Sequence, residues 1–162
     1  MSSPPDPGGL EPVVGRDPVI LVLSSFPSRK SLQHREYYGN PQNQFWKITE
    51  ALFSIPVDLP YPDRIRLLTE NGVALWDTIR SCEREGSADS RIREPVPNDV
   101  AGFVRAHPSL VLIALNGRTA DRYFRKSAQV PGVPAVTLPS TSPANAGMTF
   151  AEKVRAWMII KE

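Results

Sequence analysis

The sequence contains very few of the residues that build metal centres and disulfides. A single cysteine, Cys82, excludes an internal disulfide and a cluster held by four cysteines, and the two histidines argue against a structural zinc site. No apolar run approaches the roughly 20 residues of a membrane helix. The N-terminus also lacks the basic and apolar regions of a secretory signal. We therefore expect no metal, no membrane contact and a reducing, cytoplasmic location.

The length and composition fit one folded domain with a short N-terminal extension. A chain of 162 residues that is 41% apolar can bury a proper core. Residues 1–18 hold five prolines and two adjacent glycines, which predicts a loosely ordered tail before a domain at 19–162. The net charge is only +2, but arginine outnumbers lysine by fourteen to five. Arginine suits phosphate contacts, which would explain its excess over lysine. A GC-rich genome would produce the same excess, and both explanations stay open.

Short apolar runs alternate with helical patterns along the chain. Residues 83–98 are polar with glycine and prolines and indicate an irregular surface segment, and a short helical turn is expected within 31–38. Buried strands are expected at 19–24, 73–76, 110–115 and 135–138. Helices are expected at 44–54, 63–70, 99–106, 119–127 and 150–160, with Asp63 capping the second and Asn98-Asp99 the third. This alternation predicts a three-layer α/β/α sandwich around a four-stranded parallel sheet.

The most informative stretch follows the first strand. The apolar run 19–23 ends in Ser24-Ser25-Phe26-Pro27-Ser28, and parallel sheets bind ligands at the carboxyl ends of their strands. Two tyrosines, Tyr37 and Tyr38, come next, and Asn43 stands two residues before Phe45-Trp46. The order is therefore a buried strand, a loop of small residues, an aromatic loop and an amphipathic helix.

These residues resemble the first motif region of the uracil-DNA glycosylase superfamily, in particular its hypoxanthine-DNA glycosylase branch. The resemblance rests on FPS, SL and YYGNPQNQFWKI, and then on GVALWD, SC, GSADSRI, ND, NG and LPSTSPAN in the same order. It covers about residues 19–160. It implies the strand order 2-1-3-4 and a cofactor-free enzyme that flips a deaminated base out of DNA and hydrolyses its N-glycosidic bond.

Asn43 is the candidate catalytic residue. Its amide cannot act as a strong base, but its carbonyl oxygen can hold a water molecule. From the residues alone, capping of the helix that begins at Gln44 is the favoured role. The resemblance instead implies catalysis, because Asn before x-F-W is catalytic in the hypoxanthine branch, and one residue can serve both roles.

Phe26, Tyr38 and Asn116 are the candidate base-binding residues. Mismatch-specific relatives carry a catalytic Asn before the proline where this chain has Phe26, so catalysis shifts to Asn43, helped by backbone groups of 25–28. Tyr38 lies five residues before Asn43, as the stacking aromatic does in related glycosylases. Alternatively, Tyr37 and Tyr38 simply pack under the loop; we expect one of the two in the core and the other exposed to the pocket. Asn116-Gly117 reads the base edge or simply forms a turn. Phe45 and Trp46 are expected in the core.

The segment after the fourth strand resembles the second glycosylase motif, which enters DNA at the lesion. Its candidate DNA contacts are Ser140, Thr141, Ser142, Pro143 and Asn145, and Ser28 is added from the first loop. Hydroxyl groups can bind the flanking phosphates. An ordinary loop rich in turn-forming residues would read the same way. The cluster Ser87, Asp89, Ser90 and Arg91 matches the branch without suggesting a role.

The function predicted is a monofunctional DNA glycosylase that acts on hypoxanthine, uracil or xanthine in DNA, as a monomer associated with the nucleoid. The motifs contain no lysine except Lys47, which falls within the helix expected at 44–54, so a lyase step through a Schiff base is not expected. Two rivals are a uracil-preferring glycosylase and a module that binds damaged DNA without cutting. A flavodoxin-like or nucleotide-binding protein is disfavoured because no glycine-rich loop follows the first strand.

Overall fold

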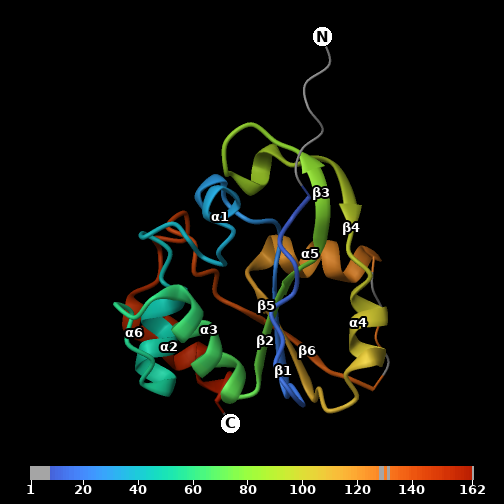
Figure 1. The fold of residues 1–162 in the computed structure, drawn as a ribbon. Coiled ribbons are helices and arrows are strands. Elements are labelled where there is room, and N and C mark those ends of the chain that lie inside the picture. Colours follow the sequence, from blue (N-terminus) through green and yellow to red (C-terminus); the bar gives the residue numbers. More distant parts are fainter. Residues whose placement is uncertain (1–7, 128–129, 131, 162) are drawn as a thin grey trace.

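A four-stranded parallel sheet forms the centre of the molecule. The computed structural model describes residues 8–161 except 128, 129 and 131. Within them the sheet has the order β2-β1-β5-β6 (Figure 1). Its strands are β1 (Ile20–Ser24), β2 (Val73–Asp77), β5 (Leu112–Asn116) and β6 (Ala135–Leu138). Numbered along the chain, this is the 2-1-3-4 order that the resemblance implied.

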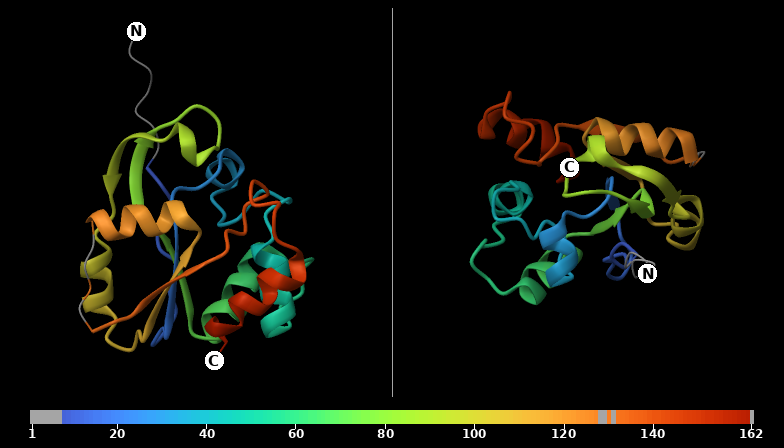
Figure 2. Two further views of the ribbon diagram at one scale, coloured as in Figure 1. Left: turned by 180° about the vertical axis from the view of Figure 1, so that it is seen from behind. Right: turned by 90° about the horizontal axis from the view of Figure 1, so that it is seen from above.

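Helices cover both faces of the sheet, so the predicted three-layer sandwich is confirmed (Figure 2). On one face, the core formed by Val22, Ile48, Leu68 and Trp157 joins the sheet to three helices and a terminal turn. These elements are α2 (Phe45–Phe53), α3 (Tyr61–Glu70), α6 (Phe150–Trp157) and η2 (Met158–Ile160). On the other face, a second core packs α4 (Val100–Ala106) and α5 (Arg118–Ser127) against Leu21 and Leu23.

Helix ends follow local chemistry, with one correction to the sequence prediction. α3 begins at Tyr61, with Pro62 in its first turn, so Asp63 lies inside the helix and is not its cap. Gly72 has φ +80° and leads from α3 into β2, as Asn71-Gly72 predicted. Asp99 caps α4 by accepting the Gly102 N–H. The helical turn expected within 31–38 is α1 (Arg29–His34), which ends where Arg35 becomes left-handed at φ 53°.

The segment 83–98 is more regular than the sequence indicated. β3 (Ile79–Glu83) and β4 (Arg93–Pro97) form an antiparallel pair, and the 3₁₀ turn η1 (Asp89–Arg91) lies between them. Every residue of β4 is exposed, so this strand lacks the apolar alternation by which strands are recognised. Figure 1 shows this hairpin and α1 beyond the carboxyl ends of the parallel strands.

Residues 8–18 of the predicted tail lie against the domain. Val13 forms a bridge with Leu75 of β2, the Gly9 N–H donates to the Arg80 carbonyl, and Leu10 is only 7% exposed. Residues 1–7 lie outside the described residues. The predicted boundary at residue 19 stays a prediction.

Candidate functional site

The carboxyl ends of the four parallel strands open into a cleft of about 1210 Å³. The cleft is bounded by the loop after β1, the segment leading to α2, the η1 region and the loop after β6. All ten predicted site residues line it: Phe26, Ser28, Tyr38, Asn43, Asn116, Ser140, Thr141, Ser142, Pro143 and Asn145. Segments more than a hundred residues apart in the chain therefore meet at one edge of the sheet, where ligands bind in α/β folds.

Asn43 is half-buried at the start of α2, and its side chain supports the helix. Its Oδ1 accepts the Phe45 N–H at 2.9 Å, which forms a turn that leads into the helix. The N-cap position itself belongs to Gln44, because the helix begins at Phe45 and not at Gln44 as predicted. A carbonyl oxygen can accept two hydrogen bonds, so this contact leaves Oδ1 a second acceptor position. The geometry is thus compatible with the dual role expected of this residue.

The two tyrosines divide between the core and the cleft. Tyr37 is 4% exposed; its hydroxyl donates to the Glu11 carbonyl, and its own carbonyl accepts the Trp46 indole N–H. Tyr38 is half-buried, and one face of its ring stacks on Phe45 with the centroids 4.1 Å apart. Phe45 and Trp46 are both buried, as expected of core residues. Phe45 thus fixes the plane of the ring predicted to stack on a flipped base.

The Tyr38 hydroxyl is hydrogen-bonded to residues at the ends of β1 and β5, which form the floor of the cleft. The Tyr38 hydroxyl is 2.5 Å from Ser24 Oγ at the end of β1 and accepts a longer bond, 3.4 Å, from Asn116 Nδ2 at the end of β5. Tyr38 itself has φ 55°, an uncommon conformation for a residue with a side chain. Burial raises its pKa above the ordinary value, so the phenol stays neutral.

Asn116 and Thr141 bind each other, and this changes what can be expected of both. Asn116 Oδ1 accepts the Thr141 N–H and its Nδ2 donates to Thr141 Oγ1, each at 3.0 Å. Thr141 has no exposed surface, so its predicted contact with DNA is not supported; it anchors the loop after β6 instead. Asn116 is 9% exposed, and its amide is used within the protein before any base edge arrives.

The rest of the loop after β6 is shaped by its small polar residues. Ser140 Oγ accepts the Ser142 N–H, Ser142 Oγ accepts the Ala144 N–H, and Asn145 Nδ2 donates to the Ser140 carbonyl. The Thr141 carbonyl accepts the Gln44 N–H, which ties this loop to the segment that carries Asn43. Both Ser140 and Ser142 stay partly exposed at the cleft, where phosphates can reach them.

Buried Lys153 of α6 strengthens that connection, and sequence reasoning missed it. Its Nζ donates to Gln44 Oε1 at 2.7 Å and to the Asn145 carbonyl at 2.8 Å. Burial lowers the pKa of this ammonium group, although both bonds favour the charged form. A lysine outside any motif gives no sequence signal for such a role.

The η1 region holds the loop after β1 in place, which gives Ser87 and Asp89 of the polar cluster a structural role. Ser25 Oγ donates to Asp89 Oδ1, and Ser87 Oγ accepts the Arg29 N–H. Arg84 donates to the Pro27 carbonyl, and its guanidinium lies 5.1 Å from the centre of the Phe26 ring. Phe26 therefore reaches the cleft while Arg84 lies over its ring. Ser28, at the start of α1, caps that helix by accepting the Ser31 N–H.

Asp77 is an acidic residue that follows the second strand, where a carboxylate either faces the site or caps the next helix, and the structure places it in the lining of the cleft. It ends β2 and is 2% exposed, and no described residue donates to its Oδ2. Burial, reinforced by the nearby Asp89 carboxylate and opposed by Arg84, raises the pKa of Asp77 to about 7. A buried carboxyl that titrates near neutral pH in a cleft is a common feature of functional sites.

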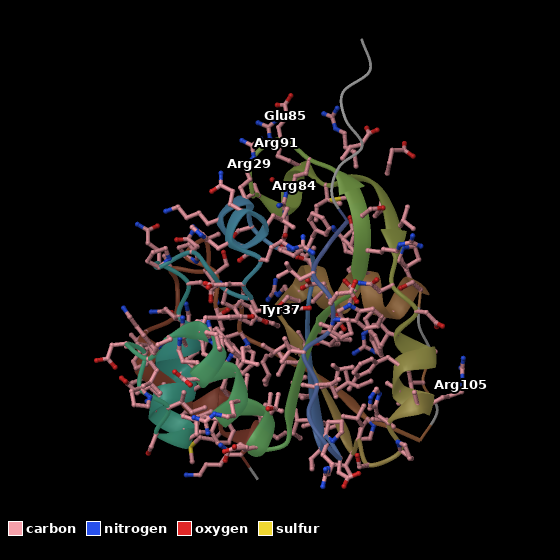
Figure 3. The ribbon with its side chains drawn as sticks, viewed as in Figure 1. Arg29, Tyr37, Arg84, Glu85, Arg91 and Arg105 are labelled. Atoms are coloured by element: carbon pink, nitrogen blue, oxygen red, sulfur yellow. The ribbon has the colours of Figure 1, made fainter. Side chains whose placement is uncertain are left out.

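Three arginines gather beside α1 and η1. Two of them, Arg29 and Arg91, directly follow Ser28 and Ser90, which line the cleft, and so mark its rim. Figure 3 shows Arg29, Arg84 and Arg91 together beside α1 and η1, and Arg105 far from them on α4. Arg29 and Arg91 are exposed, whereas Arg84 is partly covered. The arginine bias of the composition was the signal for such a surface, but composition alone could not place it.

Comparisons with known proteins define the class of the chain. The family model of the uracil DNA glycosylase superfamily matches residues 12–161. The chain belongs to this superfamily. It is 37% identical over 138 residues to a hypoxanthine DNA glycosylase of Methanosarcina acetivorans, covering 85% of this chain and 87% of that protein.

Two further similarities agree with this assignment. A hypoxanthine DNA glycosylase of Methanosarcina barkeri is 30% identical over 116 residues, covering 71% of this chain and 73% of the relative. A solution NMR structure of a candidate uracil DNA glycosylase from Methanosarcina acetivorans superposes with a TM-score of 0.79 at 32% identity. That match covers 95% of this chain and 98% of the other.

In the part of the chain that the structure describes, we find no helix with the length and apolar character required to cross a membrane.

Proposed function

We propose that this protein removes hypoxanthine from DNA by hydrolysing the N-glycosidic bond of deoxyinosine. One observation carries the proposal: Asn43, Tyr38 and the Ser140–Asn145 loop, which come from distant parts of the chain, line a single cleft. The named activity of the two Methanosarcina relatives supports hypoxanthine as the base. DNA that contains deaminated bases is then the partner of the cleft.

The reaction places a different demand on each part of the cleft. The target nucleotide leaves the helical stack, and its base slides against the free face of Tyr38, whose other face rests on Phe45. Stacking of this kind contributes on the order of 1–3 kcal/mol per base. Phe26 borders the same space.

Asn43 positions the attacking water. The C1′–N9 bond breaks, and its electron pair leaves with the base as positive charge grows on the sugar. The water oxygen then bonds to C1′ and releases a proton to solvent, because an amide cannot take it. The remaining acceptor position on Oδ1 holds the water, while the bond to the Phe45 N–H fixes the direction of the side chain.

DNA is held on either side of the cleft. Ser28, Ser140 and Ser142 present partly exposed hydroxyl groups to phosphates, with Pro143 and Asn145 beside them at the gap left by the flipped base. Thr141 and Asn116 keep this loop in position through their mutual hydrogen bonds. The exposed arginines Arg29 and Arg91 add positive charge along the rim.

The test is a cleavage assay on duplexes that carry one deoxyinosine, one deoxyuridine or one deoxyxanthosine, with hot alkali used to break abasic sites. We expect multiple turnovers on deoxyinosine at a rate well above the other two. Faster cleavage at deoxyuridine would reassign the preferred base. Folded protein that binds the duplexes and cuts none of them would support the damage-binding alternative and overturn the proposal.

The monomeric state and the nucleoid location remain predictions that accompany this function. Light scattering on the free protein and on its complex with a deoxyinosine duplex measures the first. One protein mass per lesion is expected, because the cleft is built entirely from one chain.

A further inference from the structure

The ring of Phe26, which borders the space proposed for the flipped base, rests against the chain that precedes β1. A Cβ atom added to Gly9 would stand 3.3 Å from Phe26 Cε1, so the ring lies directly on the bare backbone of this glycine. The Arg84 guanidinium lies 5.1 Å from the centre of the same ring. Phe26 lines the cleft, whereas Gly9 and Arg84 do not. The ring therefore separates these two residues from the cleft.

The backbones that carry Phe26 and Gly9 are both tied to the start of β3. The Ser25 carbonyl, one residue before the ring, accepts the Ile79 N–H at 3.1 Å. The Gly9 N–H donates to the carbonyl of the next residue, Arg80, at 2.8 Å. The first two residues of β3 thus hold the loop after β1 and residue 9 at a fixed separation, so a change of volume between them has to be taken up by the Phe26 side chain.

Residues 9–13 form a strap that is firmly seated on the domain. Leu10 is 7% exposed and belongs to the core that contains α2. The Glu11 carbonyl accepts the Tyr37 hydroxyl at 2.9 Å, and Val13 exchanges two backbone hydrogen bonds with β2. Because the strap is held at each of these points, it cannot easily retreat from the ring that lies against it.

Space, and not backbone conformation, requires glycine at position 9. The φ angle of Gly9 lies outside the left-handed region that favours glycine. An added Cβ would stand 3.4 Å from the Arg80 carbonyl oxygen and 3.5 Å from that of Ile79, besides its contact with the ring. Those oxygens belong to a paired strand, so a larger side chain displaces the ring toward the cleft. Gly8, by contrast, is exposed, and a Cβ there would meet only the Arg80 oxygen, at an ordinary 3.6 Å.

We propose, on the basis of the function proposed above, that Gly9 is a positioning residue that sets the width of the base pocket through Phe26. The bare backbone lets the Phe26 ring lie back against the strap and leaves room for a bicyclic purine beside Tyr38. A difference of one methylene in an apolar pocket changes discrimination by about 10–200-fold, so a small displacement of the ring matters. The match to the glycosylase family begins at residue 12, so the family assignment does not account for this contact.

The experiment is a double-mutant cycle on the excision of hypoxanthine from a deoxyinosine duplex. Single-turnover rates at saturating protein are measured for wild type, Gly9→Val, Phe26→Ala and the double variant. The cycle isolates the coupling between the two positions, because each single variant changes one partner of the contact. Gly8→Val adds the same side chain one residue earlier and is the matched control.

We expect Gly9→Val to slow excision by about tenfold or more when Phe26 is present, because the displaced ring occupies space that the purine needs. In the Phe26→Ala background the same substitution should change the rate by less than about twofold, because no ring is left to displace. Gly8→Val should keep the wild-type rate.

A binding measurement separates the base pocket from the rest of the DNA surface. A duplex with tetrahydrofuran in place of one nucleotide presents an abasic sugar and no base. Gly9→Val should bind this duplex with the wild-type Kd, because no base requires the space beside Phe26. A general loss of structure would weaken this binding as well, and that result would contradict a role confined to the pocket.

A wild-type rate in Gly9→Val, or equal slowing with and without the Phe26 ring, would overturn the inference. If Gly9→Val does not fold, Gly9→Ala takes its place in the cycle, because its Cβ alone displaces the ring by a few tenths of an ångström. Excision should then slow about threefold, since a misplacement of about 1 Å can cost roughly 100-fold, and a cycle without coupling contradicts the inference. Wild type that excises no base from deoxyinosine, deoxyuridine or deoxyxanthosine would instead refute the proposed function, so the two failures are distinct.

Discussion

Asn43 serves the fold through one contact and, in our proposal, the reaction through another. The variant Asn43→Ala removes both, because the Phe45 N–H loses its partner together with the water. We expect excision of hypoxanthine to fall at least 100-fold and the free energy of unfolding to fall by about 1 kcal/mol, the usual net value of one hydrogen bond. Single-turnover assays and urea denaturation measure the two effects.

The matched control for this variant is Asp99→Ala. Asp99 caps α4 through the Gly102 N–H, on the opposite face of the sheet from α2. A similar loss of stability with normal excision is expected there. If Asp99→Ala slowed excision as much as Asn43→Ala, the lower activity of Asn43→Ala would result from reduced stability and not from the lost contact with the water.

Asp77 also links stability to pH at the residue scale. Its pKa is 3.8 before burial and about 7 in the fold, so the folded state holds a proton that the unfolded state releases. The wild-type free energy of unfolding should therefore decline between about pH 4 and pH 7, by up to roughly 4 kcal/mol from this group. In Asp77→Asn this contribution is absent, so the variant gains stability relative to wild type as pH rises. Urea denaturation of both proteins at pH 4.5 and 7.5 measures this change. If the free energies of unfolding of wild type and Asp77→Asn differ by the same amount at both pH values, the buried carboxyl does not titrate as proposed.

How far single residues could be predicted depended on whether their role is local. Asn43 and Tyr38 sit in a short motif whose spacing is visible in the sequence, and both line the cleft. Asn116 was left between a turn and a base contact, because its partner Thr141 lies 25 positions away. Burial of Thr141 was likewise invisible, since serines and threonines in a turn-rich loop are exposed in most proteins.

At the scale of elements, the β3–β4 hairpin acts through Arg84. This side chain joins the hairpin to the loop after β1 by its bond to the Pro27 carbonyl and its position over the Phe26 ring. Arg84→Ala should loosen residues 25–31, increase their amide hydrogen exchange, and slow excision about tenfold through misplaced groups. Arg93→Ala, on exposed β4 of the same hairpin, removes an equal charge and should change neither measurement. Equal effects of the two variants would point to charge and not to the contact.

The elements differ in how strongly the sequence defines them. β1, β2 and β5 are apolar up to a polar last residue and are almost entirely buried, so composition alone locates them; β6, at the edge of the sheet, exposes Thr137. β4 carries two prolines and no buried residue. Irregular segments have the same composition, so the sequence could not identify β4 as a strand. α3 starts two residues before the predicted Asp63, because proline is well tolerated in a first helical turn.

At the scale of the whole molecule, positive charge is placed where DNA would lie although the net charge is only +2. Arg29 and Arg91 are exposed beside the cleft, and Arg105 is exposed far from it on α4 (Figure 3). Binding to a deoxyinosine duplex should weaken with salt, with a slope of about 0.9 per phosphate contacted. Each of Arg29→Ala and Arg91→Ala should reduce that slope by about one, and Arg105→Ala should leave it unchanged. A uniform effect of all three would show that overall charge, not the rim, attracts DNA.

The Asn116 amide can take only one orientation. The peptide N–H of Thr141 can only donate, so it fixes which end of the Asn116 amide is oxygen, and the NH₂ end donates to Thr141 Oγ1 and to the phenol oxygen of Tyr38. The Ser24 and Tyr38 hydroxyls share a hydrogen bond in which either can be the donor. A backbone group on the loop after β6 thus sets the polarity of an amide at the end of β5, while the two hydroxyls beside it can reverse their hydrogens. The floor of the cleft therefore combines one fixed donor with a hydroxyl pair that can turn to match either a donor or an acceptor.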